Sequence, residues 1–326
     1  MNLPDIHINE ALRQREFPVC TEKVYLAHAG VSPVPACVTR AVQETAATAA
    51  LDDQEEGLGD LLRTTRARAA EMLGADVGEV ALIGPTTAGL SAVAAGLDWE
   101  AGDEVLIYQD DFPVNVYPWL SLETRGVTVR RLQTPALGQI TPELVLEQLS
   151  DKTRLVALAS CHFVSGWRID HDAIGRELRA RDILFCLDAI QTLGAFPTTV
   201  EHVDFLAADA HKWLLGPCAA GVFYVRRELQ DRLAPSAFGW NNVRCPNYVA
   251  QEKMTLRTDA RRYEAGSFNI LGIAGLNAAL GLLLEVSIET ITSDLTAKRA
   301  WLVDALQAKG FEISFPEGES TAGITS

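Results

Sequence analysis

The 326-residue sequence predicts an α/β fold in which helices cover both faces of a mostly parallel β-sheet. Short, nearly continuous apolar runs recur along the chain, as in strands that are buried on both faces. Segments with helical spacing of apolar residues separate these runs. Hydrophobic residues make up 48% of the chain and charged residues 22%, a balance that supplies enough apolar material for a large core.

The strands are expected at apolar runs that end in polar or turn-forming residues. In chain order these runs are EVALIG (79–84), DEVLIY (103–108), RLVALAS (154–160), ILFCLD (183–188), DFLAAD (204–209) and GVFYV (221–225).

Helical spacing is clearest in three places. In the first, Val38, Ala41, Val42, Thr45 and Ala49 recur at helical intervals. In the second, Asp170 is expected to cap a helix that carries Ile174 and Leu178 on one side. The third, Ile270 to Val286, is the longest apolar segment, but glycines and an asparagine interrupt it, which is typical of a core helix and not of a membrane span.

The C-terminal part is expected to contain a helix from about Ser293, followed by a strand at FEISF (311–315). The last residues, TAGITS (321–326), resemble the beginning of another strand. A strand without a neighbour leaves unpaired backbone groups. The sequence therefore predicts either a covering element or a missing C-terminal piece.

The net charge and the cysteine content indicate which kinds of partner and which cellular compartment to expect. The formal net charge of −15 would repel nucleic-acid phosphates and anionic lipids, so neither is expected as a partner. The six cysteines are far apart and form no cluster with zinc-ligand spacing, so we expect no metal site and no disulfides. Cys161 and Cys186 lie in apolar runs and are expected to be buried. The N-terminus lacks a secretory signal, which favours a cytoplasmic protein.

The most informative stretch lies between residues 183 and 225. One buried strand ends on Asp188, and the next leads almost directly into His211 and Lys212. Ligands of open α/β sheets bind beyond the carboxyl ends of the strands, so Asp188 and Lys212 are expected at one edge of the sheet. Each residue alone could be an ordinary turn or surface residue, but together they favour a site.

This pair is what pyridoxal 5′-phosphate (PLP) chemistry requires. A lysine amine forms a Schiff base with the cofactor, and an acid keeps the pyridine nitrogen protonated. Lys212 would also move the α-proton of an amino acid bound as an external aldimine. A second element, GPTTAGL (84–90), precedes an apolar helix, where hydroxyl and N–H groups can bind an anion. Thr87, assisted by the Ala88 N–H, is the candidate phosphate ligand, although Thr87 could also be a simple helix cap.

Several segments together resemble the class V aminotransferase family. They are Thr86-Thr87, Asp188-Ala189-Ile190-Gln191, His211-Lys212 and Arg262-Tyr263-Glu264-Ala265-Gly266-Ser267. This family includes cysteine desulfurases, selenocysteine lyases, kynureninases and isopenicillin N epimerase-like proteins. The resemblance runs from about Tyr25 to the end of the chain and implies a PLP-dependent transferase of fold type I. It also implies a homodimer whose sites lie at the subunit interface.

The resemblance assigns roles residue by residue. Lys212 matches the Schiff-base lysine, Asp188 the partner of the pyridine nitrogen and Gln191 the donor to the ring hydroxyl. Thr87 and His211 match phosphate ligands, and Ser267 matches a hydroxyl that reaches the phosphate of the neighbouring subunit. Two residues carry alternatives: Phe112 either stacks over the cofactor or belongs to the core, and His28 either approaches the substrate or packs structurally.

The sequence also departs from the family pattern. Asp209 stands where desulfurase-like members have a phosphate-binding serine, and it is expected to bond a neighbouring backbone group or His211. Phe163 stands where several members have an asparagine. No counterpart of the arginine that binds the substrate carboxylate, or of a persulfide-forming cysteine, is found, and Cys245 is the only thiol in a loop-like stretch worth following. The implied organisation is an N-terminal segment (1–24), a large PLP-binding domain (25–255), a connecting helix region (256–290) and a partial small α+β domain (291–326).

The expected function is therefore that of a PLP-dependent enzyme acting on a small amino acid, of the cysteine desulfurase or C–S lyase type. Transamination or epimerisation on the same scaffold is one alternative, because all these reactions share the proton-abstraction step. A non-catalytic protein with the PLP fold is the other.

Overall fold

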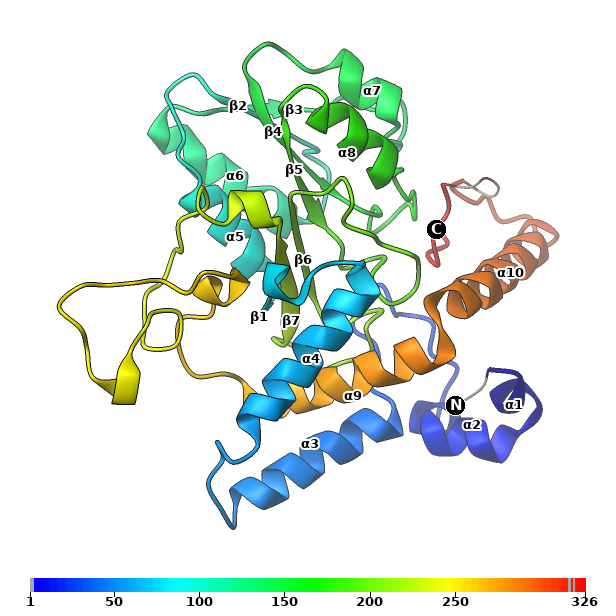
Figure 1. Ribbon diagram of the computed structural model, residues 1–326. Coiled ribbons are helices and arrows are strands. Elements are labelled where there is room, and N and C mark those ends of the chain that lie inside the picture. Colours follow the sequence, from blue (N-terminus) through cyan, green and yellow to red (C-terminus); the bar gives the residue numbers. More distant parts are fainter. Residues whose placement is uncertain (1–2, 316–317, 319) are drawn as a thin grey trace.

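A computed structural model describes residues 3–315, 318 and 320–326 (Figure 1). A seven-stranded sheet with the order β1-β7-β6-β5-β4-β2-β3 lies at its centre. The strands are β1 (Val80–Ile83), β2 (Glu104–Ile107), β3 (Thr128–Arg131), β4 (Thr153–Ala159), β5 (Leu184–Asp188), β6 (Phe205–Asp209) and β7 (Gly221–Val225).

The helices include every one that the sequence predicted. They are α1 (Leu3–Ile8), α2 (Glu10–Glu16), α3 (Ala36–Ala49), α4 (Leu58–Leu73), α5 (Thr86–Gly96), α6 (Tyr117–Leu120), α7 (Pro142–Glu147), α8 (His171–Arg179), α9 (Ile270–Val286) and α10 (Ile288–Gln307). The carboxylate of Asp170 accepts the Ala173 N–H and caps α8, as expected.

The sheet is mixed but mostly parallel, which confirms the predicted class. Strands β2, β3, β4, β5 and β6 run parallel to one another, and β7 runs antiparallel to both β6 and β1. The six strands predicted between residues 79 and 225 are present. The sequence missed β3, whose residues TVRR include two arginines, because an edge strand has one neighbour and needs no continuous apolar run.

Two apolar layers enclose the sheet. On one face, side chains from α4, α8 and α9, such as Leu73, Ile174 and Leu276, form one core. On the other face, Leu90 of α5 and Trp119 of α6 belong to a second core. Helix α5 lies very close to the sheet, because a Cβ added to Gly89 would come within 2.7 Å of the Ala207 Cβ on β6. Figure 1 shows α3, α4 and α9 packed side by side below the sheet, where α9 is the predicted core helix.

The predicted C-terminal strands do not form. FEISF has no regular structure, and Phe311 is exposed, because a β-prone run gains little without a neighbouring strand to pair with. In TAGITS, Thr321 makes a single bridge to Trp167. Ala322 and Ile324 are instead buried against Cys161 and Phe196. The C-terminal residues thus pack on the loop after β4.

No single helix among the described residues is long and apolar enough to span a membrane. The pair α9 and α10, bent by 78°, meets the length and composition test only when the two helices are taken together.

Candidate active site

The edge of the sheet at the carboxyl ends of β5 and β6 brings the two key residues together. These strands are parallel, so Asp188 at the end of β5 and Lys212 just beyond β6 reach the same edge. Both side chains are nearly withdrawn from solvent, with Asp188 2% and Lys212 7% exposed. Buried ionisable groups of opposite charge at a strand-end edge are typical of a functional site.

Burial shapes the chemistry of Asp188. It raises the pKa of this carboxyl to about 7, and the nearby charge of Asp111 acts in the same direction. The Ile190 N–H, which Asp188 Oδ1 accepts at 3.0 Å, and the charge of Lys212 oppose the shift. A carboxylate held this way gains stability from a further cation beside it. A protonated ring nitrogen would be such a cation, so Asp188 fits the predicted cofactor.

The amine of Lys212 lies against an aromatic face. Its Nζ is 5.3 Å from the centroid of the Phe112 ring. Burial lowers the pKa of Lys212, while the charges of Asp188, Asp111 and Asp209 work to raise it. A lowered pKa increases the share of free amine, which is the form that attacks an aldehyde. Phe112 is 45% exposed, so it lies at the mouth of the site and not in the core.

Gln191 connects the N-terminal segment to this edge. Its Nε2 donates to Ala29 O at 3.1 Å, and its Oε1 accepts the Trp213 indole N–H at 2.9 Å. The His28 ring stacks on Trp213, with centroids 5.7 Å apart. Ser32 Oγ donates to Lys212 O at 2.6 Å. The second hydrogen of the Gln191 amide is free of these contacts and fits the predicted donor role.

Asp209 organises the loop that carries Lys212. Its carboxylate accepts hydrogen bonds from the backbone N–H groups of Ala210, Ala219 and Ala220 and lies 2.8 Å from His211 Nδ1. Burial works to raise the Asp209 pKa, but these hydrogen bonds outweigh it and hold the pKa below its usual range. The expectation that Asp209 bonds neighbouring backbone and His211 is confirmed. Because Asp209 contacts Nδ1 of His211, the other ring nitrogen, Nε2, is left to bind another group.

The N-terminus of α5 faces the same region. Thr86 Oγ1 accepts the Asp209 N–H at 2.9 Å and is buried, so it ties the helix to the end of β6. Thr87, one residue later, is exposed in the first turn. The Ala88 N–H donates to Pro85 O at 2.8 Å and is therefore already paired. A helix start with an exposed hydroxyl is suited to a phosphate group, and Thr87 remains the candidate ligand.

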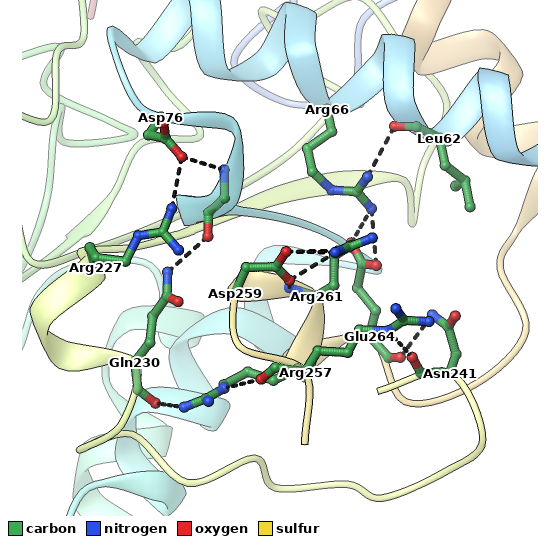
Figure 2. A network of polar contacts seen from close by, with 12 residues as sticks. Leu62, Arg66, Asp76, Arg227, Gln230, Asn241, Arg257, Asp259, Arg261 and Glu264 are labelled. Atoms are coloured by element: carbon green, nitrogen blue, oxygen red, sulfur yellow. Dashed lines mark hydrogen bonds and ion pairs between the residues drawn. The ribbon is translucent and has the colours of Figure 1, made fainter. Parts of the chain in front are cut away.

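Ser267 lies on the segment between the short helix η7 (Ala260–Tyr263) and α9. Its side chain is exposed and, in the described part of the chain, makes no hydrogen bond to the residues around Lys212. Glu264, three residues earlier, is firmly held. It pairs with Arg66 of α4 at 2.8 Å (Figure 2), and it also accepts the Leu82 N–H of β1. This contact fixes the segment that presents Ser267 to its surroundings.

The sequence drew attention to Phe112 and Phe163 separately but did not show that they form one aromatic wall together with His162. The Phe163 ring contacts the Phe112 ring edge-on, with centroids 5.3 Å apart, and His162 contacts Phe163. Asp111 and Asn115, which flank Phe112 in the chain, are both buried and hydrogen-bonded to each other. The signal in the sequence was the motif DDFPVNVYPW directly after a predicted strand, in which only Phe112 was singled out.

All six cysteines are free thiols. Cys161 and Cys186 are buried as predicted, and burial raises the pKa of Cys161 to about 12, which suppresses its thiolate form. Cys245 is half-buried, with its Sγ 3.4 Å from Val249 O. These contacts do not join a thiol to the Lys212 amine.

A group of possible metal ligands lies elsewhere, at Asp172, Glu201 and His202, whose ligand atoms fall within 4.8 Å of one another. Asp172 is already paired with Arg176 at 2.5 Å, and Arg179 Nη1 contacts both Glu201 O and His202 Nδ1. These arginines oppose a bound cation. Glu201 and His202 precede β6, whereas Lys212 follows it, so the group does not lie on the Lys212 loop.

Comparisons with known proteins agree with this geometry. A family model described as Aminotransferase class-V matches residues 24–326. A probable cysteine desulfurase of Methanothermobacter thermautotrophicus is 29% identical over 286 residues, which cover 85% of this chain and 71% of the relative. An uncharacterized aminotransferase of Bacillus subtilis, YcbU, is 28% identical over 326 residues, covering 98% and 85%. The apo structure of a cysteine desulfurase from Thermococcus onnurineus superposes with a TM-score of 0.86 at 22% identity, covering 96% of this chain and 80% of that one.

Proposed function

The chain belongs to the class V aminotransferase family of PLP-dependent enzymes, and we propose that it acts on a small amino acid in the manner of a cysteine desulfurase. The observation that carries this proposal is the buried pair of Lys212 and Asp188 at one edge of the sheet, with the Phe112 ring against the lysine amine. A buried lysine and carboxylate are costly to retain unless they bind something. This cost argues against the non-catalytic alternative.

The proposed site divides the work among the chain's own residues. Lys212 would hold PLP covalently, and Asp188 would face the ring nitrogen. The second Gln191 amide hydrogen would reach the ring hydroxyl, and Phe112 would cover one face of the ring. Thr87 and His211 Nε2 would bind the phosphate at the N-terminus of α5. When bound, the cofactor supplies an electron sink for negative charge at the α-carbon of the amino acid.

Proton transfer falls to Lys212. Because burial lowers its pKa, the amine can take the α-proton of the substrate and return it to a neighbouring carbon. The aromatic wall of Phe112 and Phe163 would exclude water from this transfer. His28, held on the Trp213 ring, would contact the substrate from the N-terminal segment.

A second subunit would complete the site. Ser267 is exposed, and the segment from Ala237 to Leu256, yellow in Figure 1, extends away from the sheet. This segment exposes Phe238, Trp240, Tyr248, Val249 and Met254. A cluster of exposed aromatic and aliphatic side chains is typical of a protein interface. We propose that it packs against a second copy, whose PLP phosphate Ser267 would reach.

The first test is the product formed from L-cysteine by PLP-loaded protein in the presence of an added thiol. A desulfurase yields alanine and transfers sulfur to the thiol, whereas a C–S lyase yields pyruvate, ammonia and sulfide. Lys212→Ala should abolish either product and remove or alter the visible absorbance of the bound cofactor. Absence of all these products from a yellow wild-type protein would refute the desulfurase proposal.

Transamination is a second candidate, because the relative YcbU, which matches almost the whole chain, is named an aminotransferase. Epimerisation is kept beside it because both reactions begin with removal of the α-proton. The same assay distinguishes them. A keto acid formed in step with the aminated form of the cofactor would identify a transaminase, and loss of optical activity of the amino acid would identify an epimerase.

A further inference from the structure

Asp111 is a second buried carboxylate at the site, and it has no role so far. It is 8% exposed and follows β2 in the loop that carries Phe112. One oxygen accepts the Phe112 N–H at 2.7 Å. The other accepts the Asn115 side-chain amide at 2.9 Å and the Ala159 N–H at 3.3 Å. Asp111 thus joins the Phe112 loop to the end of β4.

Burial raises the pKa of Asp111, and its three hydrogen-bond partners oppose this shift by favouring the ionised form. All three are N–H donors, and both carboxyl oxygens accept, which is the arrangement that an ionised carboxylate satisfies. Ala159 also pairs directly with Asp188 across β4 and β5. Asp111 therefore holds its charge one strand away from Asp188, on the side where Phe112 meets the Lys212 amine.

The charges around Lys212 come from several elements. Asp188 at the end of β5, Asp111 after β2 and Asp209 at the end of β6 all act on the amine. Cys161 after β4 adds no charge near neutral pH, because burial keeps its thiol protonated. Asp209 is committed to His211 and the backbone, and Asp188 would face the ring nitrogen. Asp111 is the remaining carboxylate in this set whose charge acts on the lysine.

We propose that Asp111 is a positioning residue of the active site, which fixes the Phe112 ring against Lys212 and holds a second negative charge beside the lysine amine. This inference rests on the proposed function, in which Lys212 carries PLP. The two effects have one origin, because the carboxylate that binds the Phe112 N–H is the same one that acts on the amine.

The test compares Asp111→Asn with Asp110→Asn, a matched control in which the neighbouring carboxyl is exposed. The first readout is the pH titration of the visible absorbance of the PLP-loaded protein. The second is the pH dependence of the rate at which cofactor-free protein captures PLP. In Asp111→Asn both midpoints should fall by roughly one pH unit, because loss of a nearby negative charge disfavours the protonated nitrogen. Asp110→Asn should leave both within about 0.3 units of wild type.

An exchange variant separates charge from structure. Asp111→Asn combined with Asn115→Asp moves the carboxylate across their hydrogen bond and should restore at least half of each shift. If Asp111→Asn does not fold, Asp111→Ser takes its place, since serine can accept a hydrogen bond but carries no charge. A variant that melts at a lower temperature but titrates like wild type would overturn the inference.

The proposed function can fail separately. Borohydride reduction followed by peptide mass spectrometry shows whether wild-type Lys212 carries PLP. Its absence there refutes the proposed function, whereas PLP on Lys212 with unshifted midpoints in Asp111→Asn refutes only the role of Asp111.

Discussion

Replacing Glu264 by alanine tests how the segment before Ser267 is held. The Glu264 side chain is 1% and the Arg66 side chain 8% exposed, and the two are 2.8 Å apart (Figure 2). Burial raises the Glu264 pKa and Arg66 opposes this shift, so the carboxylate depends on its partner. Glu264→Ala leaves the Arg66 guanidinium buried without that carboxylate and leaves the Leu82 N–H without its acceptor.

The expected loss of stability follows from these two contacts. Breaking a buried ion pair by removing one partner costs about 3–5 kcal/mol, and an unsatisfied buried N–H adds about 1–3 kcal/mol. Because the contacts share one carboxylate, their effects overlap, and about 4 kcal/mol is expected in total. At an m-value of about 3 kcal/mol/M, the urea midpoint should fall by more than about 1 M.

The matched control is Arg227→Ala. Arg227 and Asp76 are also 2.8 Å apart, but their side chains are 46% and 69% exposed, so this pair should contribute about 0–1 kcal/mol. Urea unfolding followed by circular dichroism at saturating PLP measures both variants. In addition, replacing Arg66 and Glu264 together by methionine should recover the part of the loss that comes from the broken ion pair, but not the part that comes from the Leu82 N–H. Equal midpoint shifts in Glu264→Ala and Arg227→Ala would refute the reasoning.

Three further predictions concern the site and its scaffold. In cofactor-free protein, the folded state binds the proton of Asp188 more tightly than the unfolded state does, so the stability contributed by this group falls as pH rises from about 4 to about 7. Asp188→Asn should flatten that part of the plot of urea midpoint against pH. An unchanged slope would show that Asp188 does not titrate there. Gly89→Ala should destabilise the protein by about 1–3 kcal/mol in thermal melts, because the added Cβ would meet the Ala207 Cβ at 2.7 Å. In the control Gly59→Ala, in α4, the added Cβ meets nothing within 4 Å, so this variant should be neutral or slightly stabilising. Mixing inactive Lys212→Ala with Ser267→Ala should raise the activity only if the subunits share sites, because a mixed dimer then contains one site with both residues intact. Sedimentation should first show a dimer, and a monomer in that experiment would remove the role of Ser267 in a partner's site.

The shared sheet edge of Asp188 and Lys212 could be predicted because it depends on local sequence. A buried parallel strand needs a continuous apolar run, and a polar residue at its end marks the sheet edge, so the sequence alone was enough to predict that Asp188 and Lys212 share one edge. The strand predicted at FEISF (311–315) was wrong, because the run alternates apolar and polar residues but lies beside no strand of the described chain. Strand formation requires a partner that local sequence does not name.

The sequence by itself determined the α/β class, most of the strands and helices, and the Lys212 and Asp188 pair, because periodicity and strand order act over short distances. Only the tertiary structure decided which groups surround that pair. It showed that Asp209 binds the Lys212 loop, that Gln191 is held by Trp213, and that Asp111 reaches Ala159. These contacts join residues on different strands and loops, and their geometry depends on how the elements pack in three dimensions.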